Sequence, residues 1–332
     1  MTLFDKRTIS RDQWHQLVEN SNCGSWFQTP EAFDFYSSLS FLQPFVFGVA
    51  ENDKLTGVIS GFIQADGGPV KRFFSRRAIV NGGALLHQKI SEEALLKLLL
   101  KTQHELKTQA IYIEFRNFRD YSGYKTVFEK AHFNYRPHLN FQVATPDIEF
   151  CQKNLHASKR RDVKLSQKNG VEWILTDSKS DLESFYSLLK KLYTTKVKTP
   201  LFPYEYFERL MSDRNGKIFI VKYRDEVIGG SVCVAYENKI LYNMFVCGLD
   251  GQVKNVYPST VATWAAIEYA AENGFEYFDM MGAGKPTESY GVREFKSSFG
   301  GTLVEHGRFI CVINPVLYKT GGFAVKLLRR IK

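Results

Sequence analysis

The chain has 332 residues, of which 44% are hydrophobic and 14% aromatic, and its formal net charge is +9. This apolar content is enough for packed cores, which excludes a disordered chain, and the length predicts about two domains. Every apolar run is shorter than the ~18 residues of a membrane-spanning helix, and the first residues lack the apolar stretch of a signal peptide. We therefore expect a cytoplasmic protein.

The first half of the chain predicts two helices, a hairpin and a leucine-rich helix within an α+β pattern. Ser10 and Gln13 form a capping box for the first helix, and Thr29-Pro30 begins the second. The expected elements after them are a hairpin over 45–63, a strand near 72–80, a helix over 91–107, a strand over 111–115, a short helix over 127–131 and a strand over 139–143.

The second half begins at Thr145-Pro146-Asp147, because Pro and Asp interrupt the preceding strand. We place the domain boundary there and expect domains over 1–145 and 146–332. The expected elements are a basic helix over 154–169, a strand over 173–175, a helix from Ser180, a hairpin over 218–235, a strand over 240–246, a helix over 259–272, a strand over 277–280 and a last pair of strands over 303–313.

The two halves repeat one pattern. Each hairpin has an acidic turn and then a glycine in the returning strand, Gly57 or Gly229. Each is followed by a strand, a long helix and a short strand that carries an inward-facing acid, Glu114 or Asp279. A period of about 170 residues fits a duplicated domain rather than a solenoid repeat. Two such units imply a ligand cleft between them.

The five cysteines are scattered, odd in number and without a C-x-x-C pair. They indicate neither a disulfide framework nor a zinc site, so we expect no metal and no permanently bound cofactor. The positive charge favours polyanionic partners. It is concentrated near Arg76 and Arg77, within 153–168 and within 326–332. Solvated faces and phosphate-binding sites both fit these clusters.

Two segments near the C-terminus carry the most specific pattern. Residues 278–282 read Phe-Asp-Met-Met-Gly, and residues 290–301 read Tyr-Gly-Val-Arg-Glu-Phe-Lys-Ser-Ser-Phe-Gly-Gly. This pattern resembles the C-terminal signature of the Fem family, the peptidoglycan interpeptide-bridge aminoacyltransferases built from two GNAT-like domains. The segments 26–30 and 159–171 look similar too, but the long charged helical hairpin of some members is absent between 180 and 216.

The resemblance implies an α+β fold of two tandem GNAT-like domains with mixed, mostly antiparallel sheets and flanking helices. It also implies an acyltransferase with its reaction centre near Lys296. A glycine-rich turn exposes main-chain N–H groups, and a nearby cation stabilises an oxyanion or holds a diphosphate. The structural alternative is that Phe295 and Phe299 are core residues and that Lys296 points to water.

Asp279 ends a strand inside an apolar run, where a carboxylate is costly unless it is paired or functional. It could accept a proton from the attacking amine, or it could orient Lys285 or Arg293; Glu114 holds the matching position in the first half. Tyr290 is a further proton-transfer candidate, and His306 is a weaker one. The expected substrate-binding residues are Arg293, Phe295, Gly300, Gly301, Gly282 and Lys285.

The identity of the acyl donor is indicated by the absence of a coenzyme A binding pattern in the sequence. The stretches 250–259 and 81–84 lack the glycine pattern with which GNAT enzymes hold the coenzyme A pyrophosphate. The resemblance implies aminoacyl-tRNA as co-substrate and a peptidoglycan precursor, or another amine, as acceptor. The expected RNA or phosphate contacts are Lys159, Arg160, Arg161, Arg76 and Arg77.

Two alternative functions stay open. One is an acyl-CoA-dependent transferase of surface-polysaccharide or lipid synthesis on the same fold. The other is a non-catalytic RNA- or membrane-binding protein. The tail 323–332 mixes apolar and basic residues, so it could touch the inner face of the membrane or pack back on the first domain.

Overall fold

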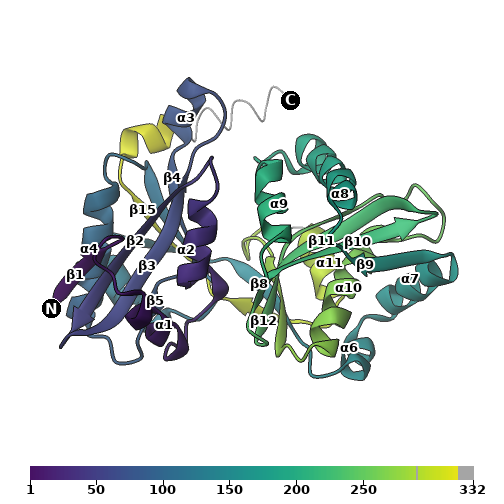
Figure 1. Cartoon of the computed structure of the whole chain (residues 1–332), viewed down its shortest axis with the longest axis horizontal. Helices are drawn as coiled ribbons and strands as arrows, with labels where there is room; N and C mark the ends of the chain where they lie inside the picture. Colours follow the sequence, from purple (N-terminus) through teal and green to yellow (C-terminus); the bar gives the residue numbers. More distant parts are fainter. Residues whose placement is uncertain (289–290, 321–332) are drawn as a thin grey trace. The chain divides into compact units, whose positions relative to one another are not determined.

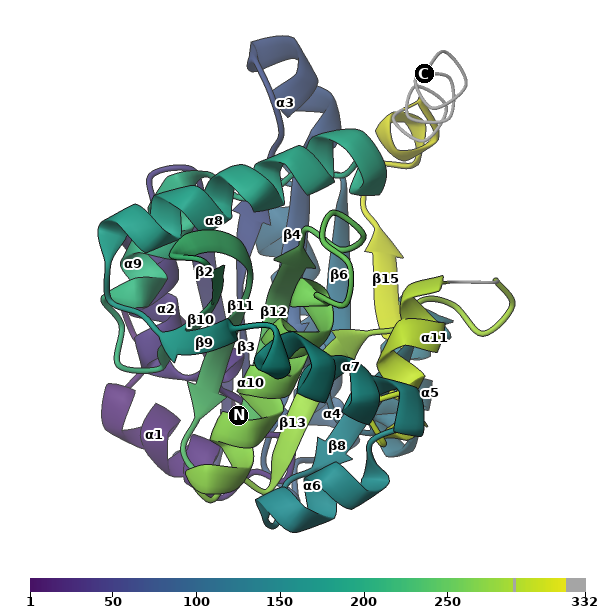
Figure 2. The same ribbon diagram turned by 90° about the vertical axis from the view of Figure 1, so that its right-hand side faces the viewer.

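The computed structural model describes residues 1–288 and 291–320 and divides into two compact units. Unit 1 consists of Met1–Pro137 and Glu305–Lys332, and unit 2 of His138–Val304. Each is an α+β unit with one sheet between helices (Figures 1 and 2). Within the described ranges, no helix combines the length and the hydropathy that crossing a membrane would require.

Unit 1 is built on an eight-stranded sheet with the order β1-β2-β3-β4-β6-β15-β7, and β5 pairs with β3. Only β4 and β6 run parallel to each other. Its strands are β1 (Thr2–Asp5), β2 (Gln43–Glu51), β3 (Lys54–Gln64), β4 (Arg77–Gly82), β5 (Leu85–Leu86), β6 (Tyr112–Asn117), β7 (Asn134–Arg136) and β15 (Arg308–Val312). Its helices are α1 (Arg11–Glu19), α2 (Pro30–Ser37), α3 (Pro69–Ser75), α4 (Glu92–Leu106) and α5 (Lys125–Lys130).

The two faces of this sheet are covered by different helices (Figure 1). Leu95, Leu98 and Leu99 lie on one stripe of α4 and share a buried cluster with Ile59 of β3. On the opposite face, Tyr36 of α2 packs against Phe62, with ring centroids 4.7 Å apart. Alternating side chains of β3 therefore contact different helices, as the pleat of a strand requires.

Unit 2 has a seven-stranded sheet with the order β14-β8-β13-β12-β11-β10-β9, and β12 and β13 are its parallel pair. The strands are β8 (Leu139–Ala144), β9 (Val171–Leu175), β10 (Gly216–Tyr223), β11 (Glu226–Tyr236), β12 (Ile240–Gly248), β13 (Tyr277–Gly282) and β14 (Thr302–Glu305). The helices are α6 (Ile148–Asn154), α7 (Ala157–Lys168), α8 (Lys179–Leu192), α9 (Tyr204–Met211), α10 (Pro258–Glu272) and α11 (Gly291–Ser297).

Helix α10 is the central helix of unit 2. Eleven of its fifteen residues are buried, on more than one face, because β12 and β11 pack on one side of the helix and α6 and α7 on others. Small alanines allow this close approach, and Trp264 fills the space between them. Helices α8 and α9 cover the other face of the sheet (Figure 1).

The duplication predicted from the sequence is confirmed by the hairpins β2–β3 and β10–β11. Both turns have two residues with positive φ, Asn52-Asp53 and Arg224-Asp225, which is a type I′ geometry. Each hairpin has a register shift at the same distance from its turn. In both, the valine before the shift pairs with the glycine that the two halves share, Gly57 or Gly229. Both turns lie one residue before the predicted acidic turns, which were Asp53-Lys54 and Asp225-Glu226.

The expected domain boundaries differ from the observed units because two strands are exchanged. Strand β8 follows the first half of the chain but pairs with β13 in unit 2, while β15 follows the second half but lies between β6 and β7 in unit 1. Asp147 does not separate domains: its side chain caps α6 within unit 2. The predicted pair of strands over 303–313 therefore belongs to two different sheets. The tail 323–332 lies outside the described residues.

Two further predictions were wrong in detail. A strand was predicted near 72–80, but residues 69–75 form helix α3. Gly68 caps this helix and Pro69 is its first residue, a position that favours proline. The basic helix over 154–169 is interrupted, because Leu155 is extended and separates α6 from α7.

The strand exchange leads to a paired test of stability. Phe309 of β15 stacks on Phe128 in the core of unit 1, with centroids 4.1 Å apart, so Phe309→Ala should destabilise unit 1 by about 3–5 kcal/mol. Hydrogen exchange should then accelerate in β4 and β6 more than in β12 and β13.

Phe299→Ala is the matched control, because Phe299 is equally buried but packs in the core of unit 2. It should accelerate exchange in β12 and β13 first. If Phe309→Ala instead loosened unit 2, the assignment of the last strand to unit 1 would be wrong.

Candidate functional site

The candidate site lies where β13 ends in unit 2. Asp279 is fully buried, and its carboxylate accepts hydrogen bonds from Asn140 Nδ2 at 2.8 Å, Gln142 Nε2 at 3.1 Å and the main-chain N–H of Met281 at 2.8 Å. The two amides belong to β8, the neighbouring strand. Within the part of the chain that the structure describes, neutral donors hold this carboxylate in the interior and no side-chain cation forms an ion pair with it.

Beyond Asp279 the strand departs from regular pairing. The register with β8 shifts between Asp279 and Gly282, and Met281 has a φ of +58°. A Cβ on Gly282 would lie 2.8 Å from the ring of His138, so the position favours glycine. The irregular turn directs three successive carbonyl groups toward α11.

Lys296 of α11 binds these carbonyls. Its ammonium donates to the carbonyl oxygens of Met280, Met281 at 3.3 Å and Gly282 at 2.9 Å, and the side chain is almost completely buried. An ammonium has three N–H donors, so this cage matches its full capacity. The structural alternative predicted that the Lys296 side chain points to water, and this part of it is wrong.

Burial lowers the pKa of Lys296 to about 8, and the nearby Asp279 carboxylate opposes this shift. At neutral pH the group is therefore still mainly an ammonium. A cation and a carboxylate thus lie close together behind one irregular strand end.

The rest of the motif holds α11 in place. The rings of Phe295 and Phe299 are 5.0 Å apart and contribute to the core of unit 2. The carbonyl of Ser298 accepts a hydrogen bond from the N–H of His156. At Gly300 the φ is +81°, and a Cβ would lie 2.5 Å from the carbonyl oxygen of Asn154. The second glycine, Gly301, is tightly packed against β8.

The loop between β13 and α11 is held by Arg293. Its guanidinium donates to the carbonyl oxygens of Ala283, at 2.9 Å, and Lys285. Lys285 forms an exposed ion pair with Glu288 at 2.7 Å. Among the described residues, the Asp279 carboxylate bonds to Asn140, Gln142 and the N–H of Met281, and not to the side chain of Arg293 or Lys285. The predicted orienting of those two side chains by Asp279 is therefore not seen. Tyr290 lies outside the described residues.

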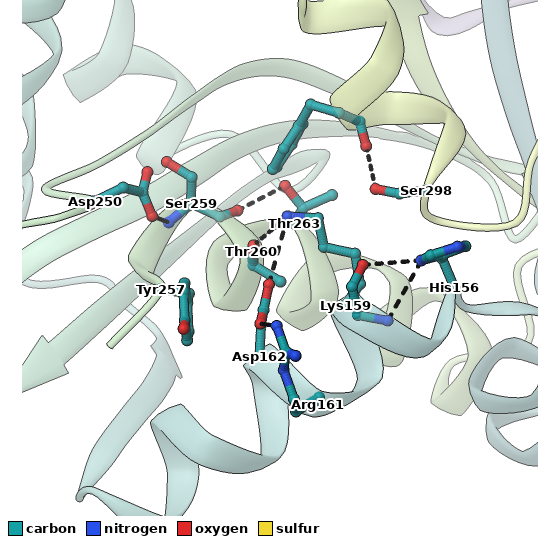
Figure 3. A network of polar contacts seen from close by, with 12 residues as sticks. His156, Lys159, Arg161, Asp162, Asp250, Tyr257, Ser259, Thr260, Thr263 and Ser298 are labelled. Atoms are coloured by element: carbon teal, nitrogen blue, oxygen red, sulfur yellow. Dashed lines mark hydrogen bonds and ion pairs between the residues drawn. The ribbon is translucent and has the colours of Figure 1, made fainter. Parts of the chain in front are cut away.

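A second polar network surrounds the first turn of α10 (Figure 3). Lys159 of α7 donates to Thr260 Oγ1 at 3.2 Å, lies 3.7 Å from Asp162, and covers the ring of Phe295 at 4.9 Å from its centroid. Lys159 thereby joins α7, α10 and α11. Arg161 is exposed and contacts Asp162 at 3.3 Å.

The loop before α10 corresponds to the stretch 250–259 singled out in the sequence. The N–H of Ser259, in the first turn, donates to the carboxylate of Asp250 at 3.2 Å. The N–H of Tyr257 donates to the hydroxyl of Ser166 at 3.0 Å. Two main-chain donors at this helix start are thus already bonded to side chains, and a carboxylate at the position disfavours an incoming phosphate.

The matching loop of unit 1 is closed by side chains. Gln28 Nε2 donates to the carbonyl oxygens of Gly82, at 3.3 Å, and Gly83, at 3.0 Å. The Tyr121 hydroxyl donates to the carbonyl oxygen of Ala84 at 2.6 Å, and its oxygen lies 3.1 Å from that of Gly82. All the side chains in this contact are buried. The segment 26–30 of the sequence therefore has a structural role here.

The two inherited acids have diverged. Glu114 of β6 is paired with Arg116 at 3.1 Å and Arg308 at 2.5 Å. Burial acts to raise the pKa of Glu114, but the two guanidinium groups outweigh it and hold the pKa at about 2. Glu114 is the centre of an ion-pair cluster, while Asp279 has neutral donors. His306 contributes its carbonyl oxygen to Asn117 at 3.0 Å.

The structure brings together Asp279, Lys296 and Gly282 at the strand end, with Phe295, Gly300 and Gly301 supporting α11. Arg76 and Arg77 lie in unit 1, where Arg77 pairs with Asp66 at 2.7 Å. Sequence reasoning missed Asn140 and Gln142. The sequence shows Asn140 and Gln142 alternating with apolar residues in 139–143. That strand was assigned to the first domain, so Asp279 could not be recognised as their partner.

Comparisons with known proteins agree with this geometry. Residues 152–297 match the family model of the acetyltransferase (GNAT) domain. The crystal structure of FemX superposes with a TM-score of 0.71 at 14% identity, covering 96% of this chain and 99% of that one. The matched segment thus carries a GNAT domain, and nearly the whole chain has the fold of FemX.

Two other solved structures share the tandem arrangement. A tandem GNAT protein from the clavulanic acid biosynthesis pathway has a TM-score of 0.60 at 10% identity and covers 95% of this chain and 99% of that chain. L-PGS from Bacillus licheniformis has a TM-score of 0.58 at 12% identity, with 97% of both chains covered. Among curated proteins, no sequence match was found. The predicted fold class is confirmed, while identities this low leave the substrate open.

The buried ammonium predicts a pH-dependent stability. The native pKa of Lys296, about 8, is below the ~10.4 of an unfolded lysine, so the unfolded chain binds more protons between these values. Relative to Lys296→Met, the free energy of unfolding of the native protein should therefore rise from pH 8 to 10, by an amount on the order of 3 kcal/mol at most.

Denaturant unfolding at several pH values measures this difference. Lys285→Met is the control, because Lys285 is exposed and its loss should leave the pH dependence unchanged. Parallel stability curves for the native protein and Lys296→Met would contradict a lowered pKa for the buried ammonium.

Proposed function

We propose that this protein transfers an aminoacyl group from aminoacyl-tRNA to a free amine of a peptidoglycan precursor, with the reaction centre at the end of β13. The observation that carries the proposal is the caged ammonium of Lys296 next to the buried Asp279. FemX and the family match supply the reaction class, and the basic surface of α7 supports an RNA donor.

In the proposed reaction the acceptor amine attacks the ester carbonyl of the donor. The new C–N bond forms, the ester C–O bond breaks, and the terminal ribose oxygen leaves with the proton that the amine gives up. Negative charge develops on the carbonyl oxygen, and the charge of Lys296 stabilises it. Exchange of one main-chain carbonyl of the cage for the oxyanion would bring the ammonium into direct contact.

Asp279 has an orienting role in this proposal. Its oxygens already accept three hydrogen bonds, and it is fully buried, so a proton from solvent-exposed substrate has no direct path to it. Asp279 instead holds Met281 and the two β8 amides, which shapes the carbonyl cage around Lys296.

The donor assignment depends on two surfaces of unit 2. At the start of α10, the N–H of Ser259 already donates to the carboxylate of Asp250 and is not available to a pyrophosphate. This contact disfavours the binding of acyl-CoA at the helix start. Helix α7 presents basic side chains around a groove of about 360 Å³ that is lined by Ala157, Arg160, Arg161, Lys164, Leu165 and Lys168. Arg160 also binds the carbonyls of Lys153 and Leu155, so the more exposed Lys164 and Lys168 are the better phosphate contacts.

We infer further that the acceptor is a precursor on the cytoplasmic side, where charged tRNA is available. The phosphates of such a precursor would be recognised by arginine or lysine side chains. Arg293 and Lys285 remain candidates for this contact, because the loop they hold adjoins the strand end.

The central test is transfer in vitro from charged tRNA to an amine-bearing precursor, followed by mass spectrometry of the product. Lys296→Ala should lower kcat at least about a hundredfold, the usual effect of removing one oxyanion stabiliser. Lys239→Ala is the control and should change kcat little, because Lys239 is exposed and pairs with Glu237 in the turn between β11 and β12. Thermal unfolding must show that both variants fold.

The same assay separates the alternatives. Transfer from acyl-CoA but not from any charged tRNA would support the CoA-dependent transferase and sink the present proposal. Absence of transfer from either donor, with RNA binding retained, would point to a non-catalytic binding protein.

A second prediction concerns the tRNA surface. Lys164→Glu/Lys168→Glu should weaken tRNA binding about tenfold or more and lower the salt slope of log Kd by about two, because two phosphate contacts are lost. Filter binding over about 50–200 mM salt measures both quantities.

Lys190→Glu/Lys191→Glu is the charge-matched control. These lysines are exposed in the last turn of α8, so the net charge changes equally while α7 is untouched. If both double variants weakened tRNA binding to the same extent, general electrostatic attraction and not a site on α7 would be responsible.

A further inference from the structure

Helix α3 carries two adjacent large aromatic side chains that the core of unit 1 does not use. Phe73 is 48% exposed and Phe74 is 45% exposed, although phenylalanine side chains are usually buried. Their rings contact each other edge to face, with centroids 5.2 Å apart. Single exposed apolar residues need no explanation, but an adjacent pair of rings on one short helix is typical of an interaction surface.

The local sequence makes this helix project. Gly67 has a φ of +75°, and Gly68-Pro69 begins the helix immediately after it. In both views α3 stands out beyond the end of β4 within unit 1 (Figures 1 and 2). The side chains of Lys71, Arg72, Phe73 and Phe74 on this helix are exposed.

The charge around the two rings is positive. Lys71 and Arg72 are exposed, and the Arg76 guanidinium lies 4.7 Å from the centroid of Phe73. No acidic residue occurs in 67–77, and the preceding Asp66 is already paired with Arg77. The helix therefore combines exposed rings with basic side chains.

A second exposed segment adjoins the end of α3. The N–H of Ile111 donates to the carbonyl of Arg76 at 2.9 Å, and the N–H of Asn314 donates to the carbonyl of Ile111 at 3.0 Å. The helical residues 315–320 follow, with Val316 70% exposed and Tyr318 39% exposed. The sequence then continues into 321–332, which again mixes apolar and basic residues.

We propose that these two segments form a docking site for an anionic lipid bilayer. We call it the aromatic–basic surface, and it consists of Lys71, Arg72, Phe73, Phe74, Val316 and Lys319. Apolar side chains enter the boundary between headgroups and acyl chains, while lysine and arginine attract anionic headgroups from its edge.

The geometry favours a bilayer over RNA. Bases bind aromatic side chains by stacking on ring faces. Here Arg76 covers a face of Phe73, and the edge-to-face contact of Phe73 with Phe74 occupies a ring face as well. The exposed ring edges and the aliphatic Val316 suit an apolar medium.

This inference goes beyond the proposed transfer reaction, and its test needs no turnover. The full-length protein is sedimented with vesicles of phosphatidylcholine alone and with vesicles that contain phosphatidylglycerol. We expect binding to the anionic vesicles that weakens with salt and is at least about tenfold weaker in Phe73→Ser/Phe74→Ser, since two ring insertions are lost.

Leu175→Ser/Leu303→Ser is the matched control for apolar exposure. These leucines are 46% and 48% exposed but belong to unit 2, so their replacement should leave vesicle binding unchanged. Thermal unfolding verifies that each variant folds. Equal losses in both double variants would overturn the proposal, because the binding would then reflect general apolar surface.

The charges allow a reciprocal test against the RNA surface. Lys71→Glu/Arg72→Glu should abolish most vesicle binding and leave tRNA binding intact. Lys164→Glu/Lys168→Glu should weaken tRNA binding and leave vesicle binding intact. The net charge changes equally in both variants. No binding to anionic vesicles by the native protein, or loss of tRNA binding instead of vesicle binding in the α3 variant, would overturn the inference; the latter result would assign α3 to RNA.

Discussion

The contact between the Lys296 ammonium and the carbonyl oxygens at the end of β13 is the interaction on which the candidate site depends. It fixes α11 against the sheet and places a positive charge in the interior of unit 2. The carbonyls converge because the strand is irregular between Asp279 and Gly282, and Asp279 maintains that irregularity through the N–H of Met281. The charge and the backbone turn thus stabilise each other.

The duplicated architecture makes the specialisation of unit 2 visible. The same position in the parallel strand pair carries Glu114 in unit 1, where two arginines neutralise it, and Asp279 in unit 2, where amides hold it. In unit 1 the loop after the first strand of this pair is closed by Gln28 and Tyr121. The acid of unit 1 is therefore enclosed by an ion-pair cluster, whereas that of unit 2 lies at an irregular strand end next to a buried cation.

The basic charge of the chain is divided among surfaces with different chemistry. Helix α7 offers lysines around a groove, without exposed aromatic rings in the segment that lines it. Helix α3 offers lysine and arginine together with two exposed rings. Phosphate recognition needs only the charge, whereas insertion into a lipid surface also needs apolar area. A single net charge of +9 accordingly supports two proposed partners.

The sequence by itself determined the duplicated hairpins and the α+β class, because turn residues and strand alternation act locally. It also proposed 278–301 as the site, and this part of the prediction still awaits the transfer assay. The tertiary structure alone decided which sheet each terminal strand joins, since β8 and β15 are similar apolar strands and their partners lie more than a hundred residues away. It also decided the partners of Asp279 and Lys296. Hydrogen bonds from a neighbouring strand and from a backbone turn leave no pattern in the order of residues, so the caged ammonium could be recognised only once the chain had folded.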